Sequence, residues 1–470
     1  MRRVLVAGGG VSGAAVARAL AARGDDVLLV DRRAAAVTDD LATLGVRYAG
    51  DLSEVPDDID LVVTSPGWPP SHALLADAIR SGVPVVGEVE IAWHLRDPAV
   101  PWLAVTGTNG KTTTVGMLTA ILRAAGRHVA EVGNVGPPVI DAVVAADRSY
   151  DVLTVELSSF QLHWAPSVTP AAGALLNIAA DHLDWHGSLE AYAKDKARIW
   201  GRGRSLAVLN ADDPYVVRLS AELPESARRL TFTQGEPAVG QLGIRNGMLI
   251  DRSIEPDGEV LIAADEIHPP GPHNAANALA AAALARSVGV TAAQVAAGLR
   301  DFEPGEHRNV TVATGQLPHG GSIRLVNDSK ATNAHAAAAS LTSYPRVVWI
   351  AGGLLKGAVA GDFAGLVEQV RDRLVAVVLL GRDRAVITEA LRRHAPEVRA
   401  IDIASAEHRG MAEAVGVATD LARAAASSSG DEVVVLMAPA AASMDMFTDY
   451  AERGRAFTEA ARAQEGIEAG

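Results

Sequence analysis

The chain has 470 residues, of which 49% are apolar and only 4% aromatic, with a formal net charge of −14 at pH 7 and no cysteine. This acidic balance disfavours nucleic acid and anionic membranes as partners, because both require clustered positive charge. The missing cysteines exclude disulfides, zinc–thiolate sites and cysteine nucleophiles, and the length favours about three domains. The chain enters an apolar strand at Val4 without a charged leader and has no apolar run of roughly 18 residues, so we expect a cytoplasmic protein.

The first segment alternates apolar strands with helical stretches, as in a small Rossmann-like sheet. Strands are expected at residues 3–7, 27–31, 60–64 and 83–86. The glycine-rich run from Gly8 to Gly13 follows the first strand, and Asp31 ends the second, which fits the dinucleotide fingerprint. Taken alone, this pattern leaves NAD binding open. The link at Asp97-Pro98 predicts a first domain of residues 1–98.

A phosphate-binding loop is predicted where the second domain begins. A strand at residues 102–106 runs into Thr106-Gly107-Thr108-Asn109-Gly110-Lys111-Thr112-Thr113, and an amphipathic helix follows. Glycines let backbone N–H groups approach phosphate oxygens, the helix N-terminus adds positive potential, Lys111 can reach the terminal phosphates and Thr112 can ligate Mg²⁺. The loop is an incomplete Walker A motif, because Val105 occupies the position of the first glycine.

The second region, residues 99–305, continues as an α/β domain. Further strands are expected at residues 151–156, 173–177 and 205–209. Polar-punctuated runs from 230 to 270 predict a small antiparallel insertion, and an Ala-rich helix is expected at 274–287. Glu156, at a strand end, and His182 could share a magnesium site beside the phosphates, since ligands gather at the carboxyl ends of parallel strands.

Lysine is rare: only five of the 42 basic residues are lysines. A chain that uses arginine so freely keeps lysine where a guanidinium cannot replace an amine, which makes the lysines candidates for chemistry. Lys196 lies in a predicted helix that Ser188 could cap, with Tyr192 at i−4 and Trp200 at i+4 on the same apolar face. We therefore expect Lys196 to point inward and Lys194 to be solvated.

The third region, residues 306–470, completes a predicted fold of three successive α/β domains. The first and third are Rossmann-like, and the central one is a mononucleotide-binding ATPase domain with a small antiparallel insertion. Strands are expected at residues 323–327, 346–351, 375–380 and 432–437. Ser443 lies between a strand and a predicted helix, so it could cap that helix and present its N-terminus to a carboxylate.

Six motifs, in order along the chain, resemble those of the Mur ligases and folylpolyglutamate synthases. TGTNGKTT after a strand is similar to their nucleotide signature. The runs Glu156-Leu157-Ser158-Ser159-Phe160-Gln161-Leu162 and Asn327-Asp328-Ser329-Lys330-Ala331-Thr332-Asn333 resemble the D-glutamate-adding branch. The remaining blocks are Asn177-Ile178 with Asp181-His182-Leu183-Asp184, His273-Asn274 with Asn277, and His307-Arg308.

The resemblance implies an ATP-dependent amide ligase that adds D-glutamate to UDP-N-acetylmuramoyl-L-alanine through an acyl phosphate, in peptidoglycan precursor synthesis. It also implies two Mg²⁺ ions and a carbamate formed on Lys196 by carbon dioxide. The implied catalytic residues are Lys111, His182, Lys196 and Arg308, and the implied metal ligands are Thr112, Glu156, His182 and Lys196. The implied ATP-binding residues are Gly107, Thr108, Asn109, Gly110, Lys111, Thr112, Thr113, Asn274, Asn277, Arg308, Asp328 and Lys330.

The resemblance likewise implies two further groups of binding residues. Those for the UDP-sugar are Ser12, Asp31, Arg32, Arg33, Ser65 and Asn134. Those for D-glutamate are Thr332, Lys356, Ser443 and Tyr450. The chain departs from the family pattern at Gly353-Leu354-Leu355-Lys356, at Ala438-Pro439-Ala440 and at Asn309.

Two alternatives remain from the sequence. One is another ligase of the same fold, either diamino-acid-adding or folate-glutamylating, which ELSSFQL and NDSKATN disfavour. The other is an NAD-dependent oxidoreductase, which leaves TGTNGKTT unexplained. Because an acyl phosphate hydrolyses in water, we expect the third domain, which carries Arg308 and Lys330, to close over the site. We also expect a monomer whose partners are small-molecule substrates.

Overall fold

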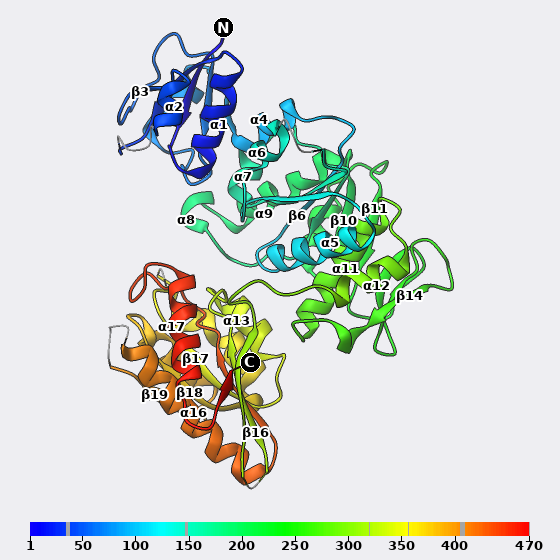
Figure 1. Ribbon diagram of the computed structural model, residues 1–470, viewed down its shortest axis with the longest axis vertical. Helices are drawn as coiled ribbons and strands as arrows, with labels where there is room; N and C mark the ends of the chain where they lie inside the picture. Colours follow the sequence, from blue (N-terminus) through cyan, green and yellow to red (C-terminus); the bar gives the residue numbers. More distant parts are fainter. Residues whose placement is uncertain (34–37, 146–148, 319, 356, 405–408, 470) are drawn as a thin grey trace. The chain divides into compact units, whose positions relative to one another are not determined.

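The computed structural model describes residues 1–33, 38–145, 149–318, 320–355, 357–404 and 409–469 (Figure 1). Three sheets built mainly of parallel strands confirm the predicted α/β fold class. The chain separates into two compact units, Met1–Ile267 with Ala276–Phe302 and His268–Ala275 with Glu303–Gly470. The first unit holds two sheets and the second holds one, while the boundaries of the three predicted domains stay a prediction.

The first sheet has five parallel strands in the order β3-β2-β1-β4-β5. Its strands are β1 (Arg3–Ala7), β2 (Asp26–Val30), β3 (Arg47–Tyr48), β4 (Leu61–Thr64) and β5 (Val85–Gly87), and its helices are α1 (Val11–Ala22), α2 (Asp39–Thr43), α3 (Ala73–Arg80) and α4 (Glu88–Leu95). The order reverses between β1 and β4, and ligands of such sheets bind outside the strand ends at that point. The four predicted strands are present, whereas β3, with two exposed residues, carries no apolar pattern that could have predicted it.

The second sheet has nine strands in the order β14-β13-β12-β11-β10-β9-β6-β8-β7. Its strands are β6 (Trp102–Thr106), β7 (Val129–Gly133), β8 (Val152–Glu156), β9 (Ala172–Leu175), β10 (Leu206–Asn210), β11 (Arg229–Phe232), β12 (Gln241–Arg245), β13 (Met248–Asp251) and β14 (Glu259–Ala263). The antiparallel insertion is confirmed for β12 to β14, with a left-handed Asn246-Gly247 turn, but it extends the main sheet because β12 pairs with β11.

Helices connect and cover the strands of the second sheet. They are α5 (Lys111–Ala124), α6 (Val139–Val144), α7 (Ser159–His163), α8 (Leu183–His186), α9 (Leu189–Ala197), η2 (Arg198–Gly203), α10 (Pro214–Ser220), η3 (Ala264–Glu266), α11 (Pro272–Arg286) and α12 (Ala292–Arg300). A buried ion pair ties α11 to the insertion: Arg286 Nε lies 2.7 Å from Asp251 Oδ2, and Arg286 also pairs with Glu259. The Ala-rich helix predicted at 274–287 is confirmed, although it begins two residues earlier and ends one residue earlier.

Two buried carboxyl groups on α4 join the first sheet's last helix to the elements of the second sheet. Glu88 Oε1 accepts a 2.7 Å hydrogen bond from the N–H of Ile140 in α6, and Glu90 accepts from the N–H of Ser167. Glu88 Oε2 is buried and has no hydrogen-bond partner in the described part of the chain. Burial raises the pKa of Glu88 to about 7, and the hydrogen bond from Ile140 opposes this only in part.

Glu88→Gln is expected to stabilise the protein at alkaline pH. Because the folded-state pKa lies above the ordinary 4.5, folding takes up a proton between these values, and stability falls as pH rises through this window. Glutamine keeps an acceptor for the N–H of Ile140 without the charge. We expect similar urea stabilities of variant and wild type at about pH 4.5, and a variant more stable by on the order of 3 kcal/mol at about pH 8. Equal stability at the higher pH would contradict the prediction.

The third sheet has seven strands in the order β19-β18-β17-β20-β16-β15-β21. Its strands are β15 (Val310–Gln316), β16 (Ser322–Asn327), β17 (Val347–Ala351), β18 (Leu374–Leu379), β19 (Arg399–Asp402), β20 (Glu432–Met437) and β21 (Glu468–Ala469). Its helices are α13 (Ala334–Leu341), η4 (Ala360–Phe363), α14 (Ala364–Val370), η5 (Arg371–Arg373), α15 (Arg384–His394), α16 (Arg409–Ser429) and α17 (Tyr450–Arg462). The four predicted strands are the central parallel ones, so the loops that follow them leave the sheet at one edge. Over the described ranges, no helix has both the length and the apolar character needed to cross a bilayer.

Candidate active site

The predicted phosphate loop joins β6 to α5. Gly110 adopts a left-handed conformation (φ +84°), and a Cβ there would lie 2.4 Å from Asn277 Oδ1, so only glycine fits. Lys111 Nζ donates 2.9 Å hydrogen bonds to the carbonyl oxygens of Gly107 and Thr108. The amine therefore lies over the loop, at the N-terminus of a 14-residue helix, where an anion is favoured.

A second set of contacts holds this loop from the segment after the neighbouring strand β9 and from α9. The Asn177 side chain accepts from the Asn109 N–H at 2.9 Å and donates to the Asn109 carbonyl oxygen at 3.1 Å. Thr108 Oγ1 accepts from the N–H of Ala179 and lies 3.0 Å from the Tyr192 hydroxyl. Because these groups occupy the Thr108 hydroxyl, only the backbone of Thr108 remains to bind phosphate. The sequence had placed Asn177 in a motif without assigning it this role.

Three predicted residues meet at the end of β8. Thr112 Oγ1 donates to Glu156 Oε2 at 2.6 Å, and Asn134 Nδ2 donates to Glu156 Oε1 at 2.8 Å. A hydroxyl and a carboxylate are ligands that Mg²⁺ accepts when nucleotide phosphates and water complete its octahedron. The two residues predicted to bind metal, Thr112 and Glu156, therefore lie beside Asn134, which is predicted to bind the substrate.

Lys196 points inward, as predicted, from α9, which Ser188 caps through the N–H of Ala191. The residue is 2% exposed, and Nζ donates to the Gly107 carbonyl oxygen at 2.7 Å. Burial, and then the nearby charge of Lys111, lower the pKa of Lys196 well below that of an ordinary amine. A neutral amine is the form that can react with carbon dioxide. Lys194 on the same helix is solvated, with its side chain 58% exposed, which also confirms the prediction.

Asp195, a buried residue beside Lys196, was not predicted from the sequence as part of the site. Asp195 Oδ2 accepts from His163 Nδ1 at 2.8 Å and from His186 Nδ1 at 3.0 Å, and His186 Nε2 lies 2.9 Å from Ser159 Oγ. Burial would raise the pKa of Asp195, but the hydrogen bonds from the two histidines lower it to about 2. This network fixes α9, and with it Lys196, against α7 and α8. Only the adjacency of Asp195 to Lys196 could have indicated it.

His182 lies at the start of α8 in a left-handed conformation (φ 52°). Its ring contacts Phe160, with centroids 4.8 Å apart, and Nε2 lies 3.6 Å from Asp181 Oδ2. Within the described ranges, no three His, Cys, Asp or Glu side chains form a group that could hold a metal. The prediction that His182 and Glu156 share a metal therefore stays a prediction, and the residues fit Mg²⁺ only with oxygen ligands from a bound nucleotide.

Five of the six residues predicted for the UDP-sugar, all except Asn134, follow β1, β2 or β4 of the first sheet. Asp31 Oδ2 accepts from the N–H of Gly9 at 2.8 Å, and Ser65 Oγ donates to the Gly8 carbonyl oxygen at 3.0 Å. Asp31 Oδ1 accepts from the N–H of Arg33, whose side chain is exposed, as is that of Arg32. Both oxygens of Asp31 thus hold nearby backbone, and each can still accept a further hydrogen bond from a ligand. Ser12 lies in the first turn of α1.

In the second unit, Arg308 lies between two left-handed residues, His307 (φ 63°) and Asn309 (φ 56°). Asparagine tolerates this conformation better than most residues, and Asn309 Oδ1 accepts a 2.7 Å hydrogen bond from the Tyr344 hydroxyl. The unusual Asn309 therefore has a structural role: it holds the backbone turn that presents Arg308. Backbone strain of this kind clusters at functional sites.

The acidic and basic residues of the Asn327–Asn333 motif have different surroundings. Asp328 is buried and accepts a hydrogen bond from the Ser340 hydroxyl, and burial raises its pKa to about 6. Lys330 Nζ lies 3.8 Å from the ring centroid of Tyr450, so these two predicted residues are brought together. Asn274 is buried at the start of α11, where its Nδ2 lies 3.4 Å from the Pro270 carbonyl oxygen.

The predicted helix cap at Ser443 is wrong. The carbonyl of Ser443 accepts from the N–H groups of Met446 and Phe447 in a turn, and α17 begins only at Tyr450. Asp449 caps α17 instead, through the N–H of Glu452 at 2.7 Å. The extra turn separates Ser443 from the N-terminus of α17. Ser443 still lies on the loop after β20. Thr332 lies on the loop after β16, and Lys356 lies outside the described residues.

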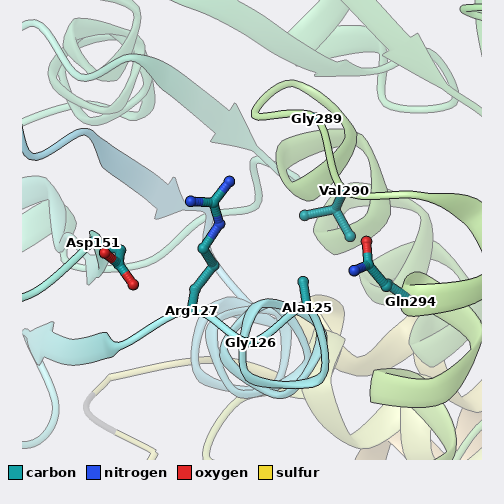
Figure 2. A pocket seen from close by; sticks show the side chains of 7 residues that line it. All are labelled: Ala125, Gly126, Arg127, Asp151, Gly289, Val290 and Gln294. Carbon is teal, nitrogen blue, oxygen red and sulfur yellow. The ribbon is translucent and has the colours of Figure 1, made fainter.

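A cavity of about 220 Å³ lies at the C-terminal end of α5 (Figure 2). Its lining residues are Ala125, Gly126, Arg127, Asp151, Gly289, Val290 and Gln294. The helix has 14 residues and places this cavity about 20 Å from Lys111, at the end where carbonyl groups disfavour anions. It is therefore not the phosphate site.

Comparison with known proteins gives matches along the whole chain. The family model of the Mur ligase middle domain matches residues 105–285, and the family model of the Mur ligase MurD-like N-terminal domain matches residues 2–87. The chain is 50% identical to the UDP-N-acetylmuramoylalanine–D-glutamate ligase of Thermobifida fusca, with 99% of each chain covered. It is also 50% identical to the protein of the same name from Streptomyces avermitilis, with 98% of each covered.

Solved structures with a similar fold include UDP-N-acetylmuramate-alanine ligase MurC from Thermotoga maritima (TM-score 0.55, 20% identity, 98% of each chain). Another is the pseudomurein peptide ligase type C from Methanothermus fervidus, with a TM-score of 0.57 and 19% identity over 93% of this chain and 97% of that one. At these identities the likeness concerns the fold alone.

Proposed function

The chain belongs to the Mur ligase family, and we propose that it joins D-glutamate to UDP-N-acetylmuramoylalanine in an ATP-dependent reaction of peptidoglycan synthesis. Full-length relatives that are half identical and carry this activity in their names support the proposal. The observation that carries the chemistry is the meeting of Thr112, Glu156 and Asn134 beside a phosphate loop that also contacts Lys196. A ligase of another branch and an NAD-dependent oxidoreductase are the alternatives that this sequence similarity disfavours.

The reaction has two steps. An oxygen of the alanine carboxylate attacks the γ-phosphorus of ATP, which breaks the bond to ADP and forms an acyl phosphate. The amine of D-glutamate then attacks the acyl carbon, loses a proton and releases phosphate. The backbone N–H groups of the loop hold the phosphates in line, and Lys111 stabilises the charge that spreads over the transferred group.

Lys196 would act as a metal ligand only after reaction with carbon dioxide. Its buried amine, with a lowered pKa, supports carbamate formation, in which the nitrogen bonds to the carbon of carbon dioxide and loses a proton. Thr112, Glu156, His182 and the carbamate would then hold two Mg²⁺ ions. When bound, Mg²⁺ neutralises charge on the phosphates and on the reacting carboxylate. Asp195 and its histidines keep α9 in place for this role.

A phosphate-release assay tests the proposed function. Purified protein receives ATP, Mg²⁺, UDP-N-acetylmuramoylalanine and one amino acid at a time, and the expected result is release with D-glutamate and none with L-glutamate or a diamino acid. Release with a diamino acid, or with a folate and L-glutamate, would replace the proposal by another branch of the fold. No release with any pair would refute ligase activity.

The first sheet is expected to bind UDP and not NAD. Full-length relatives named for a UDP-linked substrate support UDP as the ligand, and Asp31 holds the glycine-rich loop that would receive it. Isothermal titration calorimetry should therefore show binding of the UDP-sugar and no heat with NAD. Asp31→Ala, which also frees the N–H of Gly9, should weaken UDP-sugar binding about tenfold or more. NAD binding that competes with the UDP-sugar would overturn this assignment.

Several details stay predictions. These are the D-glutamate contacts of Thr332, Lys356, Ser443 and Tyr450, the ATP contacts of Asn274, Asn277, Arg308, Asp328 and Lys330, the second Mg²⁺ ion, the cytoplasmic location and the monomeric state.

A further inference from the structure

A buried arginine joins two loops at the carboxyl edge of the third sheet. Arg453, in the first turn of α17, is 2% exposed. Its Nε donates to Ser329 Oγ at 3.0 Å, its Nη2 to the Ser329 carbonyl oxygen at 2.8 Å, and its Nη1 to the Ala441 carbonyl oxygen at 3.0 Å. One planar guanidinium thus holds the loop after β16 and the loop after β20.

Further hydrogen bonds link the two loops to each other and to α17. Ser329 Oγ donates to the Tyr450 carbonyl oxygen at 2.6 Å, so its hydroxyl links Arg453 to the start of α17. The N–H of Ala440, a left-handed residue (φ 58°), donates to the Ala331 carbonyl oxygen at 2.9 Å. The two loops therefore contact each other directly, and both accept hydrogen bonds from the buried guanidinium of Arg453. They also carry Lys330, Thr332 and Ser443.

The charge of Arg453 has no direct carboxylate partner in the described part of the chain. Its three acceptors are neutral oxygens, although Asp445 and Asp328 attract it from a longer distance. Burying such a cation is costly, and hydrogen bonds to neutral oxygens offset that cost only in part. The arrangement is therefore better explained by what the guanidinium fork positions than by its contribution to stability.

We propose that Arg453 is a positioning residue of the amino-acid subsite, and that its fork sets the spacing between the Ser329 loop and the Ala441 loop. The inference rests on the proposed function, because it assigns D-glutamate to the groups on these loops. A lysine would keep the positive charge but could not bridge the two loops, since its ammonium is a single point without the planar fork. Displacement of binding groups by about 1 Å is enough to reduce activity by about 10²-fold.

The test uses the full-length protein and three variants. Arg453→Lys keeps the charge, Ser329→Ala removes only the hydroxyl of the bridge, and Arg462→Lys in the last turn of the same helix is the matched, exposed control. We expect Arg453→Lys to raise the KM for D-glutamate about tenfold or more, and Ser329→Ala to raise it less, in the same direction. Affinity for the UDP-sugar should not change, and Arg462→Lys should behave as wild type.

Hydrogen–deuterium exchange separates local displacement from unfolding. We expect faster exchange in residues 328–333 and 438–443 of Arg453→Lys, with β17 and β20 still protected. If the third sheet unfolds in that variant, Ser329→Ala decides the question. A wild-type KM for D-glutamate in a folded Arg453→Lys, or in Ser329→Ala when the former unfolds, would overturn the inference. Absence of D-glutamate-dependent phosphate release in the wild type would instead refute the proposed function.

Discussion

Replacing Lys111 by alanine is expected to reduce ligation by about 10² to 10³ while leaving the affinity for the UDP-sugar intact. The amine lies over the phosphate loop, bonded to the Gly107 and Thr108 carbonyl oxygens, at the N-terminus of α5. When the γ-phosphoryl group transfers, negative charge spreads over its oxygens. Lys111 is the one basic residue in the loop sequence from Thr106 to Thr113, so its loss removes the loop's own side-chain cation. Steady-state kinetics and calorimetry with the UDP-sugar measure the two effects separately.

The matched control for Lys111 is Arg123→Ala, because Arg123 is an exposed cation in the last turn of the same helix. It should keep the wild-type rate. The residues predicted for the UDP-sugar lie mainly around the first sheet, so binding of that substrate should be the same in both variants. A loss of UDP-sugar affinity in Lys111→Ala as large as the loss of rate would show that the two sites are not separate.

Replacing Lys196 by alanine is expected to reduce activity by about 10² or more, and replacing it by arginine should not restore activity. Both variants lose a primary amine that is buried and has a lowered pKa, and a guanidinium cannot form a carbamate. Acetate should partly rescue the alanine variant, because it can enter the vacated space and supply anionic oxygens to Mg²⁺. Rates of both variants with and without acetate provide the measurement.

An ion-pair role for Lys196 would give the opposite pattern. Arginine would then be tolerated and acetate would have no effect, so an active Lys196→Arg variant refutes the carbamate. The neighbouring Lys194, exposed and 3.8 Å from Glu190, is the matched control. Lys194→Ala and Lys194→Arg should both keep full activity, and neither should respond to acetate, since surface pairs of this kind contribute little.

The sequence by itself determined the features whose parts are contiguous in the chain. The strand, glycine turn and helix N-terminus around Lys111 form one uninterrupted segment, so composition and order were enough to predict the loop. The inward direction of Lys196 followed from helical periodicity, because residues four apart share a face. The central strands of all three sheets followed from apolar runs, whereas β3, β19 and β21, which are short or lie at sheet edges, have no such pattern.

Only the tertiary structure decided which distant groups meet. His163 lies 32 residues from Asp195, Lys196 lies 89 from Gly107, and Ser329 lies 124 from Arg453. No local periodicity specifies such pairs, because they form when separate strands end at one edge of a sheet and bring their loops together. The error at Ser443 has the same origin. Whether a chain continues from a strand into a helix or first makes a turn depends on the packing of residues 443–447 against the sheet, where Phe447 is buried, and the cap therefore falls to Asp449.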